Sequence, residues 1–137
     1  MLISTKGRYA LRIMLELAQT ESETPDTYIP LRDLAARQEI SEKYLESILK
    51  HLVDAGYLVG RRGKGGGYKL AMPIHEITVY GILDATESSL APVSCLDENG
   101  DEVPCSRIEE CKTRPVWEAL DQQIESFLEG IHLQDLL

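Results

Sequence analysis

The sequence VGRRGKGGGYKL, residues 59–70, holds four glycines and three cations in its middle, at positions 61–67. Glycine adopts positive φ without strain and lets another backbone approach closely, so this stretch predicts the tip of a β-hairpin. Arg61, Arg62 and Lys64, with Gly65 beside them, place positive charge where a nucleic-acid phosphate could bind. The same residues also suit a flexible turn that is basic only for solubility. The glycine orders of a P-loop or a dinucleotide site are absent, which disfavours a nucleotide-binding loop.

Two short helices are expected directly before this hairpin. Pro30 opens a helix over residues 31–38, and after a brief turn Ser41 is a good N-cap for a second helix, which Gly56 ends. Apolar residues recur every three or four positions in both segments, so each helix buries one face. Two helices joined by a tight turn form a helix-turn-helix pattern, whose second helix enters the major groove of DNA.

A hairpin that directly follows the second helix of this motif is a wing. A further amphipathic helix is expected over residues 5–19, and a loop over residues 20–27. The predicted fold is therefore mainly α with a small β-hairpin, a winged helix-turn-helix domain that binds double-stranded DNA. The second helix would meet the major groove, and Arg62 would reach a minor groove or a phosphate. The candidate DNA-binding residues are Ser41, Lys43, Tyr44, Lys50, Arg61, Arg62, Lys64 and Gly65.

The net charge of -9 is distributed unevenly along the chain. Residues 1–80 hold 11 lysines and arginines against 10 acidic residues, whereas residues 81–137 hold 3 against 13. This asymmetry predicts an N-terminal part that presents cations to DNA and an acidic part that phosphates repel. We therefore divide the chain into a DNA-binding domain at 1–87, a cysteine-bearing sensor loop at 88–115, and a dimerisation helix and tail at 116–137.

The C-terminal part contains the longest periodic stretch. Before it, Thr78 is a plausible N-cap, and Ile77 with Ile82 would form a hydrophobic staple for a short helix ending near Thr86. After Pro115, apolar residues follow a seven-residue repeat, which predicts a narrow seam that packs against a second copy of the same helix. The alternative is that this helix packs back on the winged domain. The seam consists of Trp117, Leu120, Ile124 and Phe127, with Ile131 continuing the repeat.

Three cysteines, Cys95, Cys105 and Cys111, fall in the irregular segment between the last two helices. Their spacing lacks the paired knuckles of a zinc ribbon. Three thiolates suit an iron-sulfur cluster, if a fourth ligand is found, or zinc or copper(I). They also suit ordinary buried thiols, or a pair that oxidises to a disulfide while the third stays free.

Other features limit the location and the class of the protein. No apolar run approaches the roughly 18 residues of a membrane span, and the N-terminus lacks the order of a signal peptide, which predicts a cytoplasmic protein with no membrane partner. No histidine lies near a nucleophile, and no paired carboxylates have a recognisable catalytic arrangement, so an enzyme is disfavoured.

With these residues assembled, the chain resembles the IscR-type family of iron-sulfur-cluster regulators, which are dimeric bacterial winged-helix transcription factors. The likeness rests on STKGRYA at 4–10, ISEKYLESIL at 40–49, RGKGGGYKL at 62–70, and three cysteines followed by a Trp-bearing helix. It implies promoter binding by the second helix and the wing, homodimerisation through the C-terminal helix, and a cluster held by the three cysteines.

The resemblance leaves the fourth cluster ligand open. In relatives with a 2Fe-2S cluster a histidine follows the last cysteine by three residues, and this position is Arg114 here. In a branch with a 4Fe-4S cluster an acidic residue near the N-terminus completes the site, and that position corresponds to Arg8. The alternative is a redox or metal-binding regulator that acts by thiol oxidation, or through a protein partner, without a cluster.

Overall fold

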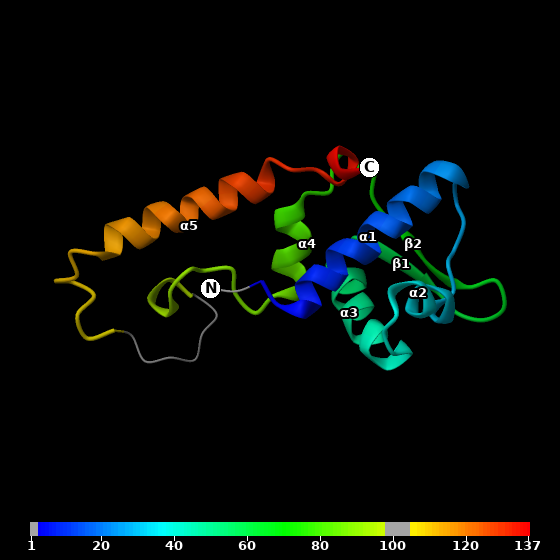
Figure 1. Cartoon of the computed structure of the whole chain (residues 1–137), viewed down its shortest axis with the longest axis horizontal. Coiled ribbons are helices and arrows are strands. Elements are labelled where there is room, and N and C mark those ends of the chain that lie inside the picture. The colour runs from blue at the N-terminus through cyan, green and yellow to red at the C-terminus, as the bar shows by residue number, and fades with distance from the viewer. Residues whose placement is uncertain (1–2, 98–104) are drawn as a thin grey trace.

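Helix α1 (Thr5–Glu23) is the element on which the N-terminal part of the fold packs (Figure 1). The computed structural model describes residues 3–97 and 105–137. Ser4 caps α1 by accepting a hydrogen bond from the backbone N–H of Gly7 at 3.1 Å. The helix runs four residues past the predicted end at Gln19, so the expected loop over residues 20–27 is wrong in its first half. The polar residues there continue the helix until the sequence approaches Pro25, which disfavours a helical residue before it.

The predicted helix-turn-helix is confirmed. Helix α2 (Leu31–Gln38) and helix α3 (Glu42–Asp54) are joined by a turn in which Glu39 has a φ of 56°. The Ser41 side chain caps α3 by accepting from the Tyr44 N–H at 3.1 Å. The buried face of α3 consists of Leu45, Ile48, Leu49 and Leu52.

The predicted wing is also confirmed, with a longer first strand. Strand β1 (Leu58–Arg61) pairs antiparallel with strand β2 (Gly67–Leu70), so Arg61 belongs to the strand and not to the turn. In the turn, the Gly66 N–H donates to the Gly63 carbonyl at 3.0 Å.

The wing is tied to the segment before α2 by an isolated β-bridge between Ile29 and Tyr68. Each of these residues donates its backbone N–H to the carbonyl of the other at 2.9 Å. Gly67, with a φ of 141°, lies so close that an added Cβ would overlap the Ile29 carbonyl. Only glycine permits this approach. The bridge fixes the wing relative to the start of α2.

Helix α4 (Val79–Thr86) packs against α1. Thr78 accepts from the Gly81 N–H at 3.0 Å, and Ile77 and Ile82 are both fully buried, which agrees with the predicted cap and staple. The carboxylate of Glu87 accepts two hydrogen bonds from Ser4, from its backbone N–H and its hydroxyl, both at 2.8 Å. These bonds join the start of α1 to the end of α4.

The C-terminal part contains a short 3₁₀ turn (Ser94–Leu96), helix α5 (Arg114–Glu129) and a second 3₁₀ turn (Leu133–Leu136). Positions 98–104 of the predicted sensor loop lie outside the described residues. Helix α5 extends away from the α1 to α3 core, and α4 is the helix that it contacts (Figure 1). Ile131 lies beyond the end of α5, so the seven-residue repeat does not continue on the helix as expected.

After α5 the chain returns to the N-terminal core. His132 forms a β-bridge with Thr78, and the Leu133 N–H donates to the Ile77 carbonyl at 2.8 Å. The Leu133 side chain is fully buried in the core formed by α1, α3 and α4. The C-terminal end of α5 is therefore attached to the core that α1, α3 and α4 form.

We expect Leu133→Ala to lower the free energy of unfolding by about 2 to 5 kcal/mol, because it leaves a cavity in the core. Leu136→Ala is the matched control, since Leu136 is 45% exposed in the same turn and should change stability by only about 0.5 kcal/mol. Urea denaturation of both variants at one protein concentration provides the measurement. Equal effects of the two substitutions would contradict the packing of the tail.

Candidate nucleic-acid interface

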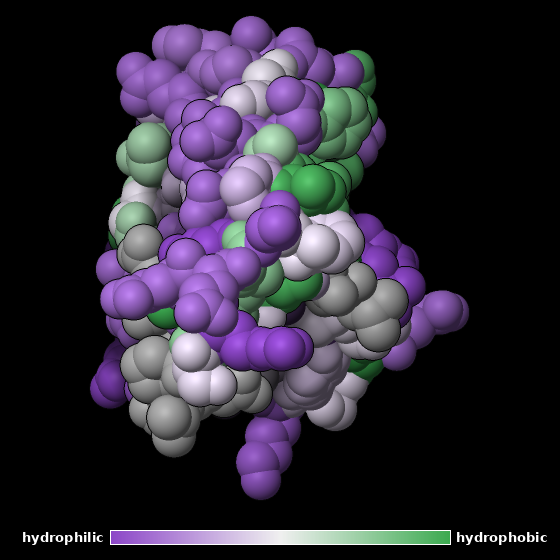
Figure 2. Space-filling model, turned by 90° about the vertical axis from the view of Figure 1, so that its left-hand side faces the viewer, coloured by the Kyte–Doolittle hydropathy of each residue, from purple (hydrophilic) through white to green (hydrophobic). Residues whose placement is uncertain are grey.

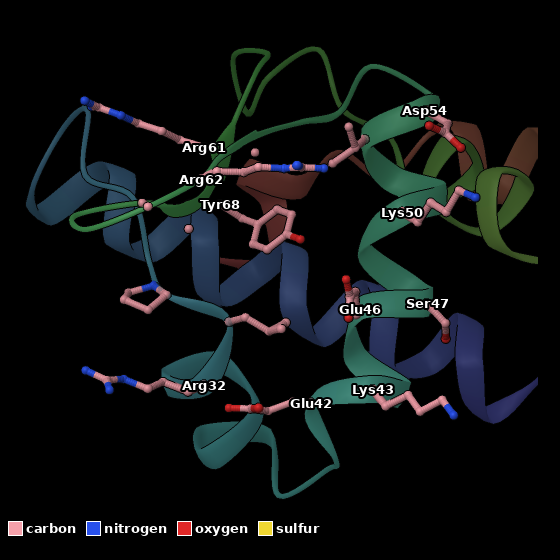
Figure 3. Close-up of a pocket in the computed structure, with 17 residues that line it drawn as sticks. Arg32, Glu42, Lys43, Glu46, Ser47, Lys50, Asp54, Arg61, Arg62 and Tyr68 are labelled. Carbon is pink, nitrogen blue, oxygen red and sulfur yellow. The ribbon is translucent and has the colours of Figure 1, made fainter.

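A groove lies between α3 and the wing, with the start of α2 at one end (Figure 3). Its walls carry both charges. The cations are Arg32, Lys43, Lys50, Arg61 and Arg62, and the acidic residues are Glu42, Glu46 and Asp54. All of these side chains belong to exposed residues.

The two arginines of the wing leave it in different directions. Arg62 extends across the groove toward α3, whereas Arg61 extends away from α3 (Figure 3). Lys43 and Lys50 project from α3 on the side away from the wing (Figure 3). This arrangement places Arg62 in the groove, and Lys43, Lys50 and Arg61 along its outer edges.

Tyr68 lies in the groove on the wing side and faces α3 (Figure 3). Partial burial raises the pKa of its hydroxyl, the Glu46 carboxylate adds to the rise, and Arg62 opposes it. Tyr68 therefore keeps its proton at neutral pH and can donate or accept a hydrogen bond. Arg32, Glu46 and Tyr68 were not among the predicted site residues. Their positions in the sequence could have indicated them, since Arg32 and Glu46 lie on the two helices of the helix-turn-helix and Tyr68 lies on the second strand of the wing.

The predicted DNA-binding residues divide into two groups. Lys43, Lys50, Arg61 and Arg62 line the groove, whereas the other four lie outside its lining. Ser41 is engaged as the cap of α3, and Tyr44 is half-buried, with its ring packed edge-on against Tyr9 at a centroid distance of 6.1 Å. Lys64 and Gly65 are exposed at the tip of the wing.

The three cysteines lie between α4 and α5. Cys95 and Cys105 are exposed, and Cys111 is half-buried. The Cys111 Sγ lies 3.3 Å from the Thr113 hydroxyl. Hydrogen bonds from the Thr113 side chain and from the backbone of Thr113 and Arg114 lower the pKa of Cys111, because they stabilise the thiolate.

The fit of the three cysteines to a metal centre depends on their donor chemistry and on how closely they are grouped. Thiols, in particular one with a lowered pKa, are the right donor chemistry for iron-sulfur, zinc or copper(I). Across residues 3–97 and 105–137, however, no three His, Cys, Asp or Glu side chains are grouped as a metal site requires. Arg114 is the first residue of α5, and its Nε forms an ion pair with the Glu118 Oε1 at 2.7 Å. The donor set fits a cluster in its chemistry, and the described part of a single chain does not bring three such donors together.

The C-terminal half is acidic in space as well as in sequence. A second pocket between α4 and α5 is lined by Tyr80, Asp84, Asp97, Asp121 and Glu125 among others. Burial and then the nearby carboxylates, Asp84 first, raise the pKa of Tyr80. Figure 2 views the end of the molecule where the cysteine segment and the start of α5 lie, and most of this face is hydrophilic with smaller apolar patches.

Helix α5 exposes the predicted seam. Trp117, Leu120 and Phe127 are 37%, 43% and 68% exposed, and Ile124 is half-buried. No residue of α5 is buried. Apolar side chains this large are normally covered in the assembled protein when they share one helix face.

No helix in the described ranges combines the length and the apolar character that a transmembrane segment needs.

Known proteins resemble this chain over its whole length. A sequence profile for Rrf2, described as an iron-dependent transcriptional regulator, matches residues 3–137. The HTH-type transcriptional regulator IscR of Aliivibrio salmonicida is 37% identical over 137 residues, which is 100% of this chain and 77% of that protein.

Two solved structures have a similar backbone. The structure of IscR from T. potens superposes with a TM-score of 0.73 at 34% identity, and the match covers 99% of this chain and 85% of that one. The structure of CymR, the global cysteine regulator of B. subtilis, superposes with a TM-score of 0.75 at 34% identity, covering 99% and 95%.

Proposed function

The chain belongs to the Rrf2 family of DNA-binding transcriptional regulators, and we propose that it binds promoter DNA as a homodimer under the control of an iron-sulfur cluster. The resemblance to IscR-type regulators found in the sequence is confirmed. The relatives are named as transcriptional regulators, which agrees with the expectation that the chain is not an enzyme. Such a regulator would act in the cytoplasm, on the chromosome.

The observation that carries the DNA-binding proposal is the set of cations on α3 and the wing, which lie in the groove and along its edges. Lys43 and Lys50 project from α3, and Arg62 reaches toward α3 from the wing (Figure 3). A recognition helix in the major groove would bring these lysines to base edges or to the flanking phosphates. The wing would then lie over the adjacent backbone, where Arg62 can enter a minor groove or bind a phosphate. Ser41, Tyr44, Lys64 and Gly65 would contribute at the two ends of this surface.

Replacing Arg62 with alanine should weaken binding to a duplex that the wild-type protein selects from a random library. Loss of one phosphate contact lowers the slope of log affinity against log salt by about 0.9, and loss of a base contact costs about 1 to 3 kcal/mol. Arg107→Ala is the matched control, since Arg107 is an exposed cation of the acidic half. Fluorescence anisotropy at several salt concentrations provides the measurement. Wild-type affinity and slope in Arg62→Ala would refute the assignment.

The exposed seam of α5 supports a homodimer. A helix that leaves Trp117, Leu120 and Phe127 uncovered can bury them against the same face of a second copy, and a two-fold interface does so symmetrically. Two copies would present two recognition helices to two half-sites of a promoter.

We expect Phe127→Ala to raise the dimer dissociation constant by roughly 10- to 100-fold, because a buried aromatic side chain contributes about 1.5 to 3 kcal/mol. Gln122→Ala, an exposed polar position of the same helix, should leave assembly unchanged. Sedimentation equilibrium distinguishes the two variants. A wild-type protein that stays monomeric at tens of micromolar would contradict a dimer formed by this seam.

Cys95, Cys105 and Cys111 are the residues that would hold the cluster, whose redox-active iron they would ligate through sulfur. The cluster type, 2Fe-2S or 4Fe-4S, and the fourth ligand stay open. The segment between α4 and α5, which contains the three cysteines, joins the DNA-binding part to the proposed dimer helix (Figure 1). A sensor at this place can shift the population of DNA-competent dimers, if it favours one of the two forms.

The alternative function, thiol-based control without a cluster, has its own support. Cys111 has a lowered pKa, and the thiolate is the form of cysteine that reacts with oxidants. The described part of a single chain groups no metal ligands. Oxidation of these thiols, or a protein partner at the same segment, would then replace the cluster as the signal.

Anaerobic reconstitution with iron and sulfide should give a coloured wild-type protein whose DNA affinity differs from that of the apoprotein. Each single Cys→Ser variant should bind less iron and sulfide, whereas Ser106→Ala should match the wild type. Visible absorption, iron and sulfide analysis and DNA titration form the readout. A colourless wild type whose DNA affinity still changes on thiol oxidation would support the alternative and overturn the cluster.

A further inference from the structure

The segment at residues 24–30 lies beside the wing, on the edge of β2 away from β1. Its Tyr28 ring faces two cations of the wing, one from each strand. The Arg61 guanidinium carbon is 5.7 Å from the ring centroid, and the Lys69 Nζ is 5.1 Å from it. Both distances allow attraction between a cation and the electron-rich face of the ring.

Only one of these two cations is held by a carboxylate in the described part of the chain. The Lys69 Nζ donates to the Asp26 Oδ1 at 2.7 Å, and Asp26 has a φ of 62° on the same segment. No ion pair joins Arg61 to a described carboxylate within 4.0 Å. Lys69 is therefore engaged within the protein, whereas Arg61 keeps a charge that can serve an external anion.

The backbone next to Tyr28 is held in place by Ile29. Ile29 exchanges two backbone hydrogen bonds with Tyr68, so the backbone next to Tyr28 is part of the wing's hydrogen-bonded ladder. Tyr28 is itself half-buried. The half-buried ring therefore lies beside the paired strands of the wing, where the long Arg61 side chain contacts it.

We propose that Tyr28 is a positioning residue for DNA binding. Its ring holds the Arg61 guanidinium on the outer side of the wing, where Arg61 can bind a backbone phosphate other than the phosphate that Arg62 reaches from the groove. The inference rests on the proposed binding of DNA by the wing. Arg61 and Arg62 extend in opposite directions (Figure 3), so the wing can contact the nucleic acid at two separate places.

The physical benefit is preorganisation. A free arginine side chain samples many rotamers and loses that freedom when it binds a phosphate. Because Arg61 rests on the ring, its side chain has lost part of its rotamer freedom before DNA binds. Its planar guanidinium can stack on Tyr28 while its N–H groups stay available to a phosphate. Arg62, directed across the groove, has no such support from this ring, which lies on the other side of the wing.

The experiment compares Tyr28→Leu with Tyr28→Phe on the duplex selected by the wild type. Leucine removes the ring face without changing charge and should reduce affinity about 2- to 5-fold, the range expected of an exposed cation–π contact. Phenylalanine keeps the ring face and should bind within about 2-fold of the wild type. Thermal unfolding and circular dichroism check that both variants keep the fold.

A double-mutant cycle separates positioning from a general structural effect. In an Arg61→Ala background, Tyr28→Leu should cause no further loss of affinity, whereas in a Lys69→Met background its full effect should remain. NMR of the free protein adds a readout that needs no DNA. The Arg61 δ protons should be shifted upfield by the ring in wild type and in Tyr28→Phe, and this shift should vanish in Tyr28→Leu.

The outcomes distinguish this inference from the proposed function. If the wild type binds DNA and Arg62→Ala weakens it, but Tyr28→Leu or Arg61→Ala binds like the wild type, the positioning role is refuted and DNA binding by the groove stands. Absence of the upfield shift in the wild type also refutes it. If the wild type binds no duplex DNA, the proposed function fails and this inference fails with it.

Discussion

The two hydrogen bonds between Ile29 and Tyr68 are the constraint on which the candidate interface depends. They attach the wing to the segment that leads into α2, and α2 packs against α3. The wing therefore keeps its place relative to α3 through this backbone pairing together with the packing of β1 on α3 and of β2 on α1. Gly67 makes the pairing possible, since any side chain there would overlap the Ile29 carbonyl. An isolated two-stranded hairpin is marginal in water, and this pairing adds a third backbone segment to a wing whose Leu58 and Leu70 are buried in the core.

Charge separation explains how an acidic chain can bind DNA. The wing and α3 present Lys43, Lys50, Arg61 and Arg62 at one end of the molecule, while α4, α5 and the cysteine segment carry most of the acidic excess. At physiological salt the Debye length is about 8 Å, so distant carboxylates weaken the attraction of the wing for phosphates only slightly. The acidic half instead disfavours other orientations of the protein on DNA.

Helix α5 and the cysteine segment belong together in the function that we propose. The helix has no buried residue, and its large apolar side chains are exposed and would be covered in the proposed dimer. Three thiols precede it on the connection from α4. The return of the chain through Leu133 anchors the far end of α5 in the N-terminal core. In the proposed function, this anchored end and the cysteine segment before α5 would couple the state of the thiols to the placement of the DNA-binding parts.

The sequence alone determined the elements whose signals are local. The cap at Ser41, the helical periodicity and the glycines of the wing predict α2, α3 and the hairpin, because capping, amphipathic burial and turn formation each involve residues a few positions apart. The candidate residues Lys43 and Arg62 followed from their places in this pattern. Only the tertiary structure decided which side chains share the groove, how the wing meets residue 29, and where Leu133 is buried. The bridge between residues 29 and 68 and the burial of Leu133 join residues far apart in the sequence, and the groove combines side chains of α2, α3 and the wing. Their formation depends on the packing of the whole chain, which no short-range periodicity encodes.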